Sequence, residues 1–238
     1  MTDRKRLNCW IKPAHLQTRA VESYADRFAC HPARLIVLDD FLRDEVAASL
    51  NRFLTTEAAF KISYGVYSDK DSSGTIADVS RQDWIKAKDR ERFFRFRQLS
   101  GARLDCRHSE RTATAHDFFE AVRGPDFRRY FQTICGAELK TVKMNAYSYR
   151  RGDFLRAHSD DDNLKRLAFV FYLSAGWERS FGGELTMIGP DGRVTEVESR
   201  FNSLVLFDVT AGTEHYVNKI KWSAGEAARV SIGGWFYS

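Results

Sequence analysis

The chain has 238 residues, of which 43% are hydrophobic and 29% charged, a composition typical of a globular domain with a core of its own. It has no apolar run near the roughly 18 residues of a membrane span, which excludes such a span. No cysteine pair has C-x-x-C spacing, so the sequence gives no sign of a thiolate zinc site. The start of the chain lacks the pattern of a secretory leader, and we therefore predict a cytoplasmic location. The formal net charge of +5 arises in residues 86–111, which hold nine Lys or Arg against four Asp or Glu, while the rest of the chain balances at 28 against 28.

The first 32 residues are predicted to be an extension that precedes the main domain. Pro13 is placed to open a helix through the segment AHLQTRAVESYADRF, because proline fits the first turn of a helix. Pro32 closes the segment. We therefore divide the chain into an N-terminal extension, residues 1–32, and one domain, residues 33–238.

The main domain is predicted to begin with a short buried strand and a helix. Leu35–Leu38 are four consecutive apolar residues, which is typical of a buried strand. Asp39 or Asp40 would then supply the oxygen that caps a helix N-terminus. The apolar residues of that helix fall on one face, at Leu42, Val46, Leu50 and Phe53.

Residues 33–140 are predicted to form a mainly helical support layer. The polar segment GVYSDKDSSGTIADVS, residues 65–80, has the composition of a loop. Helices are expected around Trp84–Phe96 and His116–Tyr130. Gly124–Pro125 should break the second helix into two pieces, because proline lacks the N–H that a helix interior needs.

The basic segment, residues 86–111, interleaves its positive charges with phenylalanines. Two interpretations remain open. An amphipathic element would bury the phenylalanine face and leave the arginines in solvent. The same mixture also occurs where proteins contact nucleic acid, and Arg95, Arg97 and Arg103 are the side chains that such a partner, or an acidic one, would meet.

From Thr141 onward, short β-rich runs follow one another between Gly, Asp and Asn turns. Many short strands at this spacing predict a sandwich or barrel. Eight strands after a helical half predict a double-sheet jelly roll, the cupin-like double-stranded β-helix, in residues 141–238. The predicted strands are Thr141–Tyr149, Asp153–His158, Leu167–Leu173, Glu184–Ile188, Val194–Val197, Ser203–Asp208, Glu214–Val217 and Arg229–Tyr237.

Two of the six histidines lie in the strand-rich half, each at the end of a predicted strand. His158 has Asp160 two residues on, and His215 follows 57 residues after His158. Taken alone, the H-x-D spacing favours a capped turn over a metal site. Two imidazoles and one carboxylate on a single face leave open positions on a metal, as in non-heme Fe(II) oxygenases. We predict such a site, and we treat Asp161 and Asp162 as residues of the turn.

Arg229 and Ser231 alternate on the last predicted strand, so their side chains point to the same face. A buried arginine needs an anionic partner, and its planar fork of donors suits a carboxylate. No carboxylate is obvious on the predicted strands. A bound organic acid is therefore favoured over the alternative, an internal salt bridge.

Together these residues resemble one family. The segments YSYRRGDFLRAHSD, VFYL, FGGEL, FNSLVLFD, GTEHYV and RVSIGGWFY stand in the order found in Fe(II)/2-oxoglutarate-dependent dioxygenases of the prolyl 4-hydroxylase-like branch. The match runs from Met144 to Tyr237, and DFLRDEVAASL resembles the helix that precedes this core. Within the branch the chain most resembles the Ofd/Tpa type, which hydroxylates a prolyl residue of a ribosomal protein, although it has one jelly roll where some of these relatives have two.

The resemblance implies a role for each site residue. The Fe(II) ligands would be His158, Asp160 and His215. The residues around the 2-oxoglutarate cosubstrate would be Arg229, Tyr149, Tyr172 and Ser231, with Arg229 on the distal carboxylate. O₂ would be the second cosubstrate, and the family also allows ascorbate as a further cofactor.

The substrate stays open, because these residues hold iron and cosubstrate rather than the oxidised group. Hydroxylation of a prolyl residue in a protein or peptide, with release of succinate and CO₂, is the preferred function. A free amino acid or another small metabolite is the alternative substrate. A non-catalytic jelly-roll binding or sensor module is a third possibility, but it predicts the loss of a metal ligand or of Arg229. Substrate contacts are expected from residues 63–80, the basic segment and the loop Trp177–Phe181.

Overall fold

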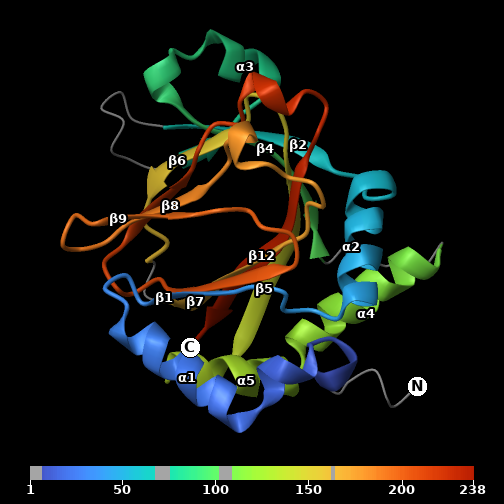
Figure 1. Cartoon of the computed structure of the whole chain (residues 1–238). Helices are drawn as coiled ribbons and strands as arrows, with labels where there is room; N and C mark the ends of the chain where they lie inside the picture. The colour runs from blue at the N-terminus through green and yellow to red at the C-terminus, as the bar shows by residue number, and fades with distance from the viewer. Residues whose placement is uncertain (1–6, 68–75, 102–108, 162–163) are drawn as a thin grey trace.

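The computed structural model describes residues 7–67, 76–101, 109–161 and 164–238. The strands form one antiparallel sheet that curves into a nearly closed barrel, with helices packed along its lower and right-hand sides in Figure 1. The predicted jelly roll with a helical support layer is therefore confirmed. No helix among the described residues is long and apolar enough to cross a membrane.

All eight strands predicted after Thr141 are present. Their alternating or continuously apolar residues are the reason, because both patterns are typical of strands that bury one or both faces. The strands are β5 (Thr141–Tyr149), β6 (Phe154–His158), β7 (Lys165–Tyr172), β8 (Leu185–Ile188), β9 (Val194–Val197), β10 (Ser203–Asp208), β11 (Glu214–Val217) and β12 (Arg229–Tyr237).

The order of the strands brings distant segments together. With β1 (Leu35–Leu38) and β4 (Arg92–Ser100), the sheet runs β1-β10-β7-β12-β5-β4-β6-β11-β8-β9. In the antiparallel pair of β12 and β5, Arg229 lies opposite Tyr149. In the pair of β11 and β6, His215 lies opposite His158. The topology alone therefore places the two predicted histidine ligands side by side.

Helices cover the outer face of β12 and its neighbours with an aromatic core. These helices are α1 (Thr18–Cys30), α2 (Asp44–Thr56), α4 (Glu110–Arg123) and α5 (Pro125–Cys135), whereas α3 (Arg81–Lys86) contacts β2 at the top of the view in Figure 1. Phe118 on α4 packs edge-on against Phe171 on β7, and Phe131 on α5 against Phe236 on β12. Each of these rings is at most 1% exposed, and burying a side chain of this size stabilises the fold by roughly 1.5–3 kcal/mol.

The predicted break at Gly124–Pro125 is confirmed. α4 ends at Arg123, Gly124 is extended, and Pro125 opens α5 at a position where a helix needs no N–H donor. α5 ends before Gly136, whose φ of 70° is left-handed and suits a residue without a side chain.

The described part of the N-terminal extension packs into the same core. Ile11 is fully buried and forms a β-bridge with Leu42, and Phe28 on α1 is also fully buried. The single helix predicted from Pro13 is wrong, because a short 3₁₀ turn, Pro13–Leu16, is separated from α1 by the extended Gln17.

The predicted cap of the next helix is also wrong. α2 begins after Arg43, which makes no capping bond with its side chain. Asp40 has a left-handed φ of 54° and instead forms an ion pair with Lys12, at 2.6 Å. The acidic Asp44 and Glu45 stand in the first turn, where they complement the positive end of the helix dipole.

The predicted helix around Trp84–Phe96 is wrong over most of its length. α3 accounts only for residues 81–86, and the arginine- and phenylalanine-rich run that follows is strand β4. β4 pairs with β5, with β6 and with β2 (Lys61–Tyr67). The predicted loop of residues 65–80 is partly a hairpin, because β2 pairs with β3 (Ile76–Asp78); residues 68–75 of that loop lie outside the described residues.

The arginines of β4 serve an internal carboxylate. Asp153 is fully buried in the turn between β5 and β6, and its two oxygens accept from Arg95 Nε at 2.5 Å and Arg97 Nη1 at 2.6 Å. The prediction that these two arginines meet an external partner is therefore not supported, and Arg103 lies outside the described residues.

Asp153→Ala is expected to lower the free energy of unfolding by about 3 kcal/mol, because it removes the buried carboxylate and leaves Arg95 and Arg97 without their partner. Urea denaturation followed by circular dichroism measures it. Asp161→Ala, at an exposed position, is the matched control and should change the unfolding free energy by less than about 0.5 kcal/mol. Equal stability of the two variants would contradict the role of Asp153.

Candidate active site

The three predicted metal ligands lie together at one end of β6 and β11. One ligand atom from each of His158, Asp160 and His215 lies within 4.8 Å of the others. The Nε2 atoms of His158 and His215 lie 3.8 and 3.4 Å from the carboxylate oxygens of Asp160. Two imidazoles and one carboxylate thus converge on one point, which is the donor set of a non-heme Fe(II) site.

Neighbouring groups orient this set. His158 Nδ1 lies 2.9 Å from the carbonyl oxygen of Arg156, which favours the tautomer that leaves Nε2 free to bind a metal. Trp235 Nε1 donates to Asp160 Oδ2 at 2.6 Å. Burial, aided by the neighbouring His158, lowers the pKa of His215 to about 3, so this imidazole is neutral near pH 7, the form that ligates metals.

Asp161 is exposed, and its N–H donates to Ser159 Oγ, so these two residues form the turn that follows the strand. Asp162 lies outside the described residues.

Arg229 is the second centre of the site. It is 3% exposed at the start of β12. Its Nε donates to Ser199 Oγ at 2.7 Å, and Nη2 lies 3.4 Å from the hydroxyl of Tyr172. Nη1 is buried and has no hydrogen-bond partner. Among the residues that the structure describes, no carboxylate lies within ion-pair distance of Arg229, so the internal salt bridge is not found. A buried cation of this kind is costly unless an anion pairs with it.

Two tyrosines enclose the guanidinium. Its central carbon lies 4.8 Å from the ring centre of Tyr149 and 5.0 Å from that of Tyr172. Burial raises the pKa of Tyr149 far above its usual value, so its hydroxyl stays protonated and can donate to an anion. Ser231 lies opposite Tyr172 in the sheet and is buried, so all four predicted cosubstrate residues come together.

One glycine permits this close packing. Gly183 has a left-handed φ of +78°, and a Cβ atom there would lie 2.4 Å from Ile220 Cδ1 and 3.1 Å from Arg229 Cδ. A larger residue would displace Ile220 and crowd the Arg229 side chain.

A single cavity of about 300 Å³ joins the two centres. The predicted residues that line it are His158, Asp160, His215, Arg229, Tyr149, Tyr172 and Ser231. Tyr147 also lines it, and burial raises its pKa to about 12. Sequence reasoning missed Tyr147, although its alternation with Tyr149 on β5 was a usable signal.

The rest of the cavity wall is apolar. Phe93, Phe94 and Leu155 line it. The Phe93 ring meets that of His158 edge-on at 5.6 Å, and Phe94 and Leu155 pack in the cluster that contains Tyr149. The cavity reaches the surface at Ile76 on β3, which is 40% exposed. The loop Trp177–Phe181 does not contribute to the lining that the structure describes.

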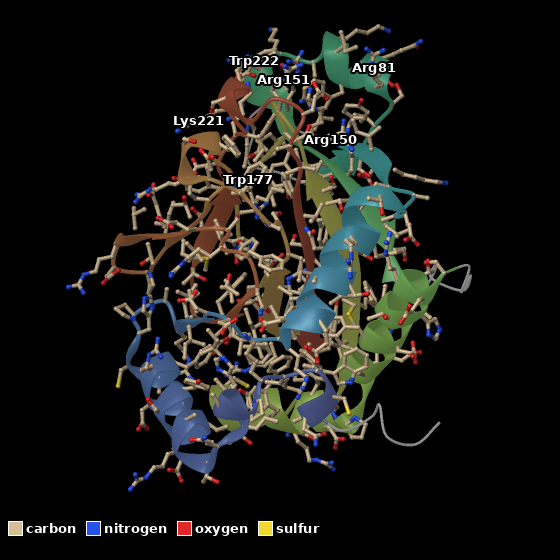
Figure 2. All side chains as sticks on the ribbon, turned by 45° about the vertical axis from the view of Figure 1, so that its right-hand side comes forward. Arg81, Arg150, Arg151, Trp177, Lys221 and Trp222 are labelled. Atoms are coloured by element: carbon tan, nitrogen blue, oxygen red, sulfur yellow. The ribbon has the colours of Figure 1, made fainter. Side chains whose placement is uncertain are left out.

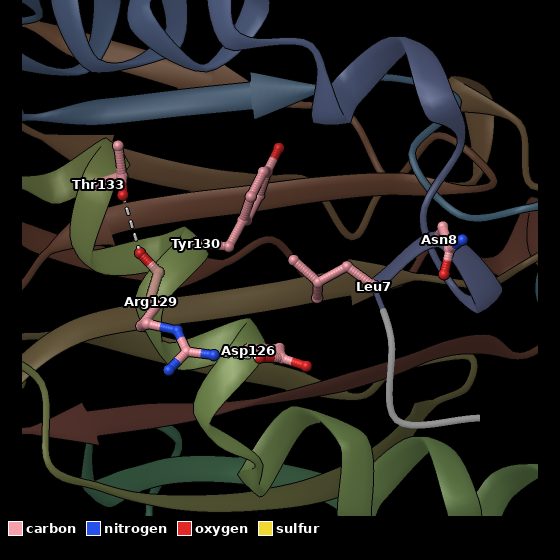
Figure 3. A pocket seen from close by; sticks show the side chains of 6 residues that line it. All are labelled: Leu7, Asn8, Asp126, Arg129, Tyr130 and Thr133. Carbon is pink, nitrogen blue, oxygen red and sulfur yellow. Dashed lines mark hydrogen bonds and ion pairs between the residues drawn. The ribbon is translucent and has the colours of Figure 1, made fainter. Parts of the chain in front are cut away.

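A second hollow, shown in Figure 3, lies where the N-terminal segment meets α5. Of the described residues that line it, the charged ones are Asp126 and Arg129, and these pair with each other. It contains none of the predicted site residues.

Comparisons with known proteins agree with this geometry. Residues 144–237 match the family model of the 2OG-Fe(II) oxygenase superfamily. Prolyl 3-hydroxylase OGFOD1 of Xenopus laevis is 36% identical over 132 residues, and OGFOD1 of Mus musculus is 33% identical over 119 residues. These alignments cover 52% and 47% of this chain but 24% and 22% of the two relatives, so the chain spans about a quarter of their length.

Solved structures show the same fold. A prolyl-4-hydroxylase of Pseudomonas putida superposes with a TM-score of 0.61 at 20% identity, covering 91% of this chain and 98% of the other. A prolyl hydroxylase of Trichoplax adhaerens, in complex with a peptide fragment of the hypoxia inducible factor oxygen degradation domain, gives a TM-score of 0.64 at 14% identity, covering 95% and 93%.

The family match spans the strands that carry His158, Asp160, His215 and Arg229, and the curated relatives align to about half of the chain. By its sequence match and its convergent site, the region of residues 144–237 belongs to the 2OG-Fe(II) oxygenase superfamily, a family of oxygenases that use Fe(II) and 2-oxoglutarate.

Proposed function

We propose that this chain is a dioxygenase that hydroxylates a prolyl residue of a protein or peptide, with release of succinate and CO₂. The observation that carries the proposal is the cavity itself. A buried arginine with a donor that lacks a partner shares about 300 Å³ with a convergent set of two histidines and one aspartate. An organic acid and a metal are thus the two groups that would satisfy this cavity.

We assign Fe(II) to His158, Asp160 and His215. When bound, the iron with 2-oxoglutarate and O₂ supplies the oxidation of an unactivated C–H bond. The protein's task is to hold three donors on one face and to leave the remaining positions open. His158 and Asp160 come from one strand end and His215 from the next strand, so the sheet fixes their spacing.

We assign the distal carboxylate of 2-oxoglutarate to Arg229. The bond from its Nε to Ser199 holds the guanidinium in place, so Nη1 stays available for an anion. A charge-assisted bond to a guanidinium is among the strong hydrogen bonds, especially in a dry cavity. Tyr149, Tyr172 and Ser231 would add neutral donors around the same carboxylate.

Trp235→Phe is expected to weaken Fe(II) binding by about 10–100-fold, because it removes the donor that orients Asp160 and leaves the ring in place. Anaerobic calorimetric titration with Fe(II) measures this directly. Trp177→Phe is the matched control, since Trp177 Nε1 donates to the carbonyl oxygen of Gly182 outside the metal set. Unchanged iron affinity in Trp235→Phe would contradict the positioning role.

The apolar wall supports a peptide-linked substrate. A free amino acid carries an ammonium and a carboxylate, and each needs a partner when buried. Among the described residues, the charged lining consists of the metal set and Arg229, which we assign to Fe(II) and 2-oxoglutarate. Phe93, Phe94 and Leu155 instead suit an uncharged ring such as that of proline. The relatives named as prolyl hydroxylases support the same substrate class.

The direct test is succinate release by the iron-loaded protein with proline-containing peptides, compared with free proline. We expect turnover with peptides, with a mass gain of one oxygen on proline and a product analysis that separates 3- from 4-hydroxyproline. Turnover of free proline alone would instead favour the small-metabolite function.

We also propose the domain division given above, with a dioxygenase domain of residues 33–238, and a cytoplasmic location. The free thiols of Cys9, Cys30 and Cys135 are in keeping with a reducing compartment.

A further inference from the structure

An exposed basic surface lies on two loops away from the cavity lining. Arg150 and Arg151 stand in the turn between β5 and β6, and Lys221 and Trp222 in the loop between β11 and β12 (Figure 2). Backbone hydrogen bonds tie the two loops together, from Gly152 N–H to the Ile220 carbonyl at 2.9 Å and from Ile220 N–H to the Asp153 carbonyl at 3.0 Å. The four side chains therefore stand on one rigid base, which we call the Trp222 surface.

Trp222 is 78% exposed, the highest fraction among the large hydrophobic side chains that the structure describes. The guanidinium of Arg151 lies over its ring, with its central carbon 4.3 Å from the ring centre. This stack holds the guanidinium and its N–H donors beside the aromatic ring. The aromatic face and the fork of donors thus form one unit.

The described part of the chain supplies no acid that pairs with the positive charges of the Trp222 surface. Arg150, Arg151 and Lys221 are exposed, and no carboxylate among the described residues lies within ion-pair distance of them. Asp153, the acid next to them in the chain, is buried and is already paired with two arginines of β4. The exposed acid nearest along this loop, Glu226, follows four residues after Trp222.

Arg81 adds a fourth exposed cation at the start of α3 (Figure 2). Arg95 connects α3 to the turn that carries Arg151. Its guanidinium lies 5.7 Å from the ring centre of Trp84 on α3 and donates to the Arg151 carbonyl at 2.7 Å.

We propose that the Trp222 surface binds single-stranded nucleic acid, with an unpaired base on the indole of Trp222 and phosphates on Arg150, Arg151 and Lys221. Proteins that bind single strands combine such cations with an exposed aromatic face. An acidic peptide fits less well, because a carboxylate gains nothing from the negative face of an indole ring. The surface thus lies outside the basic segment 86–111, whose Arg95 and Arg97 are occupied.

The test is fluorescence anisotropy of a labelled uridine 12-mer with the wild-type chain at several salt concentrations. Three phosphate contacts predict a slope of log K against log salt of about −2, or about a 20-fold loss of affinity from 50 to 200 mM salt. Trp222→Ala should weaken binding about tenfold, and Trp222→Phe should retain most of the affinity because the ring remains.

A charge-matched control separates this surface from the general positive charge. Arg150→Glu with Arg151→Glu should weaken binding more than about tenfold and flatten the salt slope. Arg19→Glu with Arg27→Glu makes the same charge change at exposed positions on α1, at the opposite end of the molecule in Figure 1, and should change affinity less than about twofold.

Three results would overturn the proposal. The first is an equal loss of affinity for the uridine 12-mer in the two double variants. The second is that a 12-base-pair duplex binds as tightly as the single strand and Trp222→Ala changes neither affinity, and the third is that the chain binds a labelled polyglutamate peptide and not the oligonucleotide. Circular dichroism melting of each variant confirms that it is folded. The assay needs no iron or 2-oxoglutarate, so its outcome is independent of the proposed hydroxylase function.

Discussion

Asp160→Ala is expected to reduce succinate release by more than about 100-fold, beyond the range for residues that only orient a metal ligand. The carboxylate is the sole anionic donor of the convergent set, and it lies within 3.8 Å of both histidine Nε2 atoms. Its removal leaves only two imidazoles, and no negative charge, to hold a divalent cation. Coupled measurement of succinate under saturating Fe(II), 2-oxoglutarate and peptide gives the rate.

The neighbouring Asp161→Ala is the matched control, because it removes the same group one residue on, from an exposed position of the turn. We expect wild-type turnover for this variant. If Asp160→Ala kept turnover, or if both variants lost it to the same degree, the assignment of Asp160 to the metal would be wrong.

Arg229→Ala is expected to raise the dissociation constant for 2-oxoglutarate by at least about 30-fold, corresponding to the 2–5 kcal/mol lost when a buried charge pair is broken. Fe(II) affinity should change little, because the guanidinium touches Ser199, Tyr149 and Tyr172 rather than the metal set. Anaerobic calorimetry with each ligand separates the two effects.

Arg229→Lys should restore only part of the affinity for 2-oxoglutarate, since lysine keeps the charge but loses the planar fork. Arg179→Ala, which alters an exposed arginine paired with Glu198, serves as the control and should bind 2-oxoglutarate as the wild type does. Wild-type affinity for 2-oxoglutarate in Arg229→Ala would contradict the assignment.

The strand-rich half could be predicted from the sequence because local pattern and tertiary structure agree there. β5 alternates apolar and polar residues, and β10 is continuously apolar and entirely buried. Glycine and aspartate turns separate these runs. The predicted bounds of β5, β10 and β12 match the observed ones.

β4 could not be predicted in this way. Its buried residues Phe93, Phe96 and Leu99 recur every three positions, which resembles the period of a helix. Pairing with β2 and β5 decides in favour of a strand, and such long-range pairing leaves no local signal. The same holds for the ion pairs between β4 and Asp153, whose members lie 56 and 58 residues apart.

The residues predicted to hold the metal and the cosubstrate could be found from the sequence, but the residues that hold them in place were harder to find. Trp235 lies six residues after Arg229 on the same strand, so alternation places it on the same face and could have marked it as a neighbour of the metal set. Ser199 follows β9 in an irregular segment, and its contact with Arg229 depends on how that segment folds back. No spacing rule in the sequence would find it.

The most direct test of the account is an anaerobic titration of the wild-type chain with Fe(II) and then with 2-oxoglutarate, followed by admission of O₂ with a proline-containing peptide. We predict one Fe(II) bound per chain, 2-oxoglutarate binding that is lost in Arg229→Ala, and succinate release when O₂ enters. Wild-type protein that binds neither iron nor 2-oxoglutarate would contradict the account and favour a jelly roll that acts without catalysis.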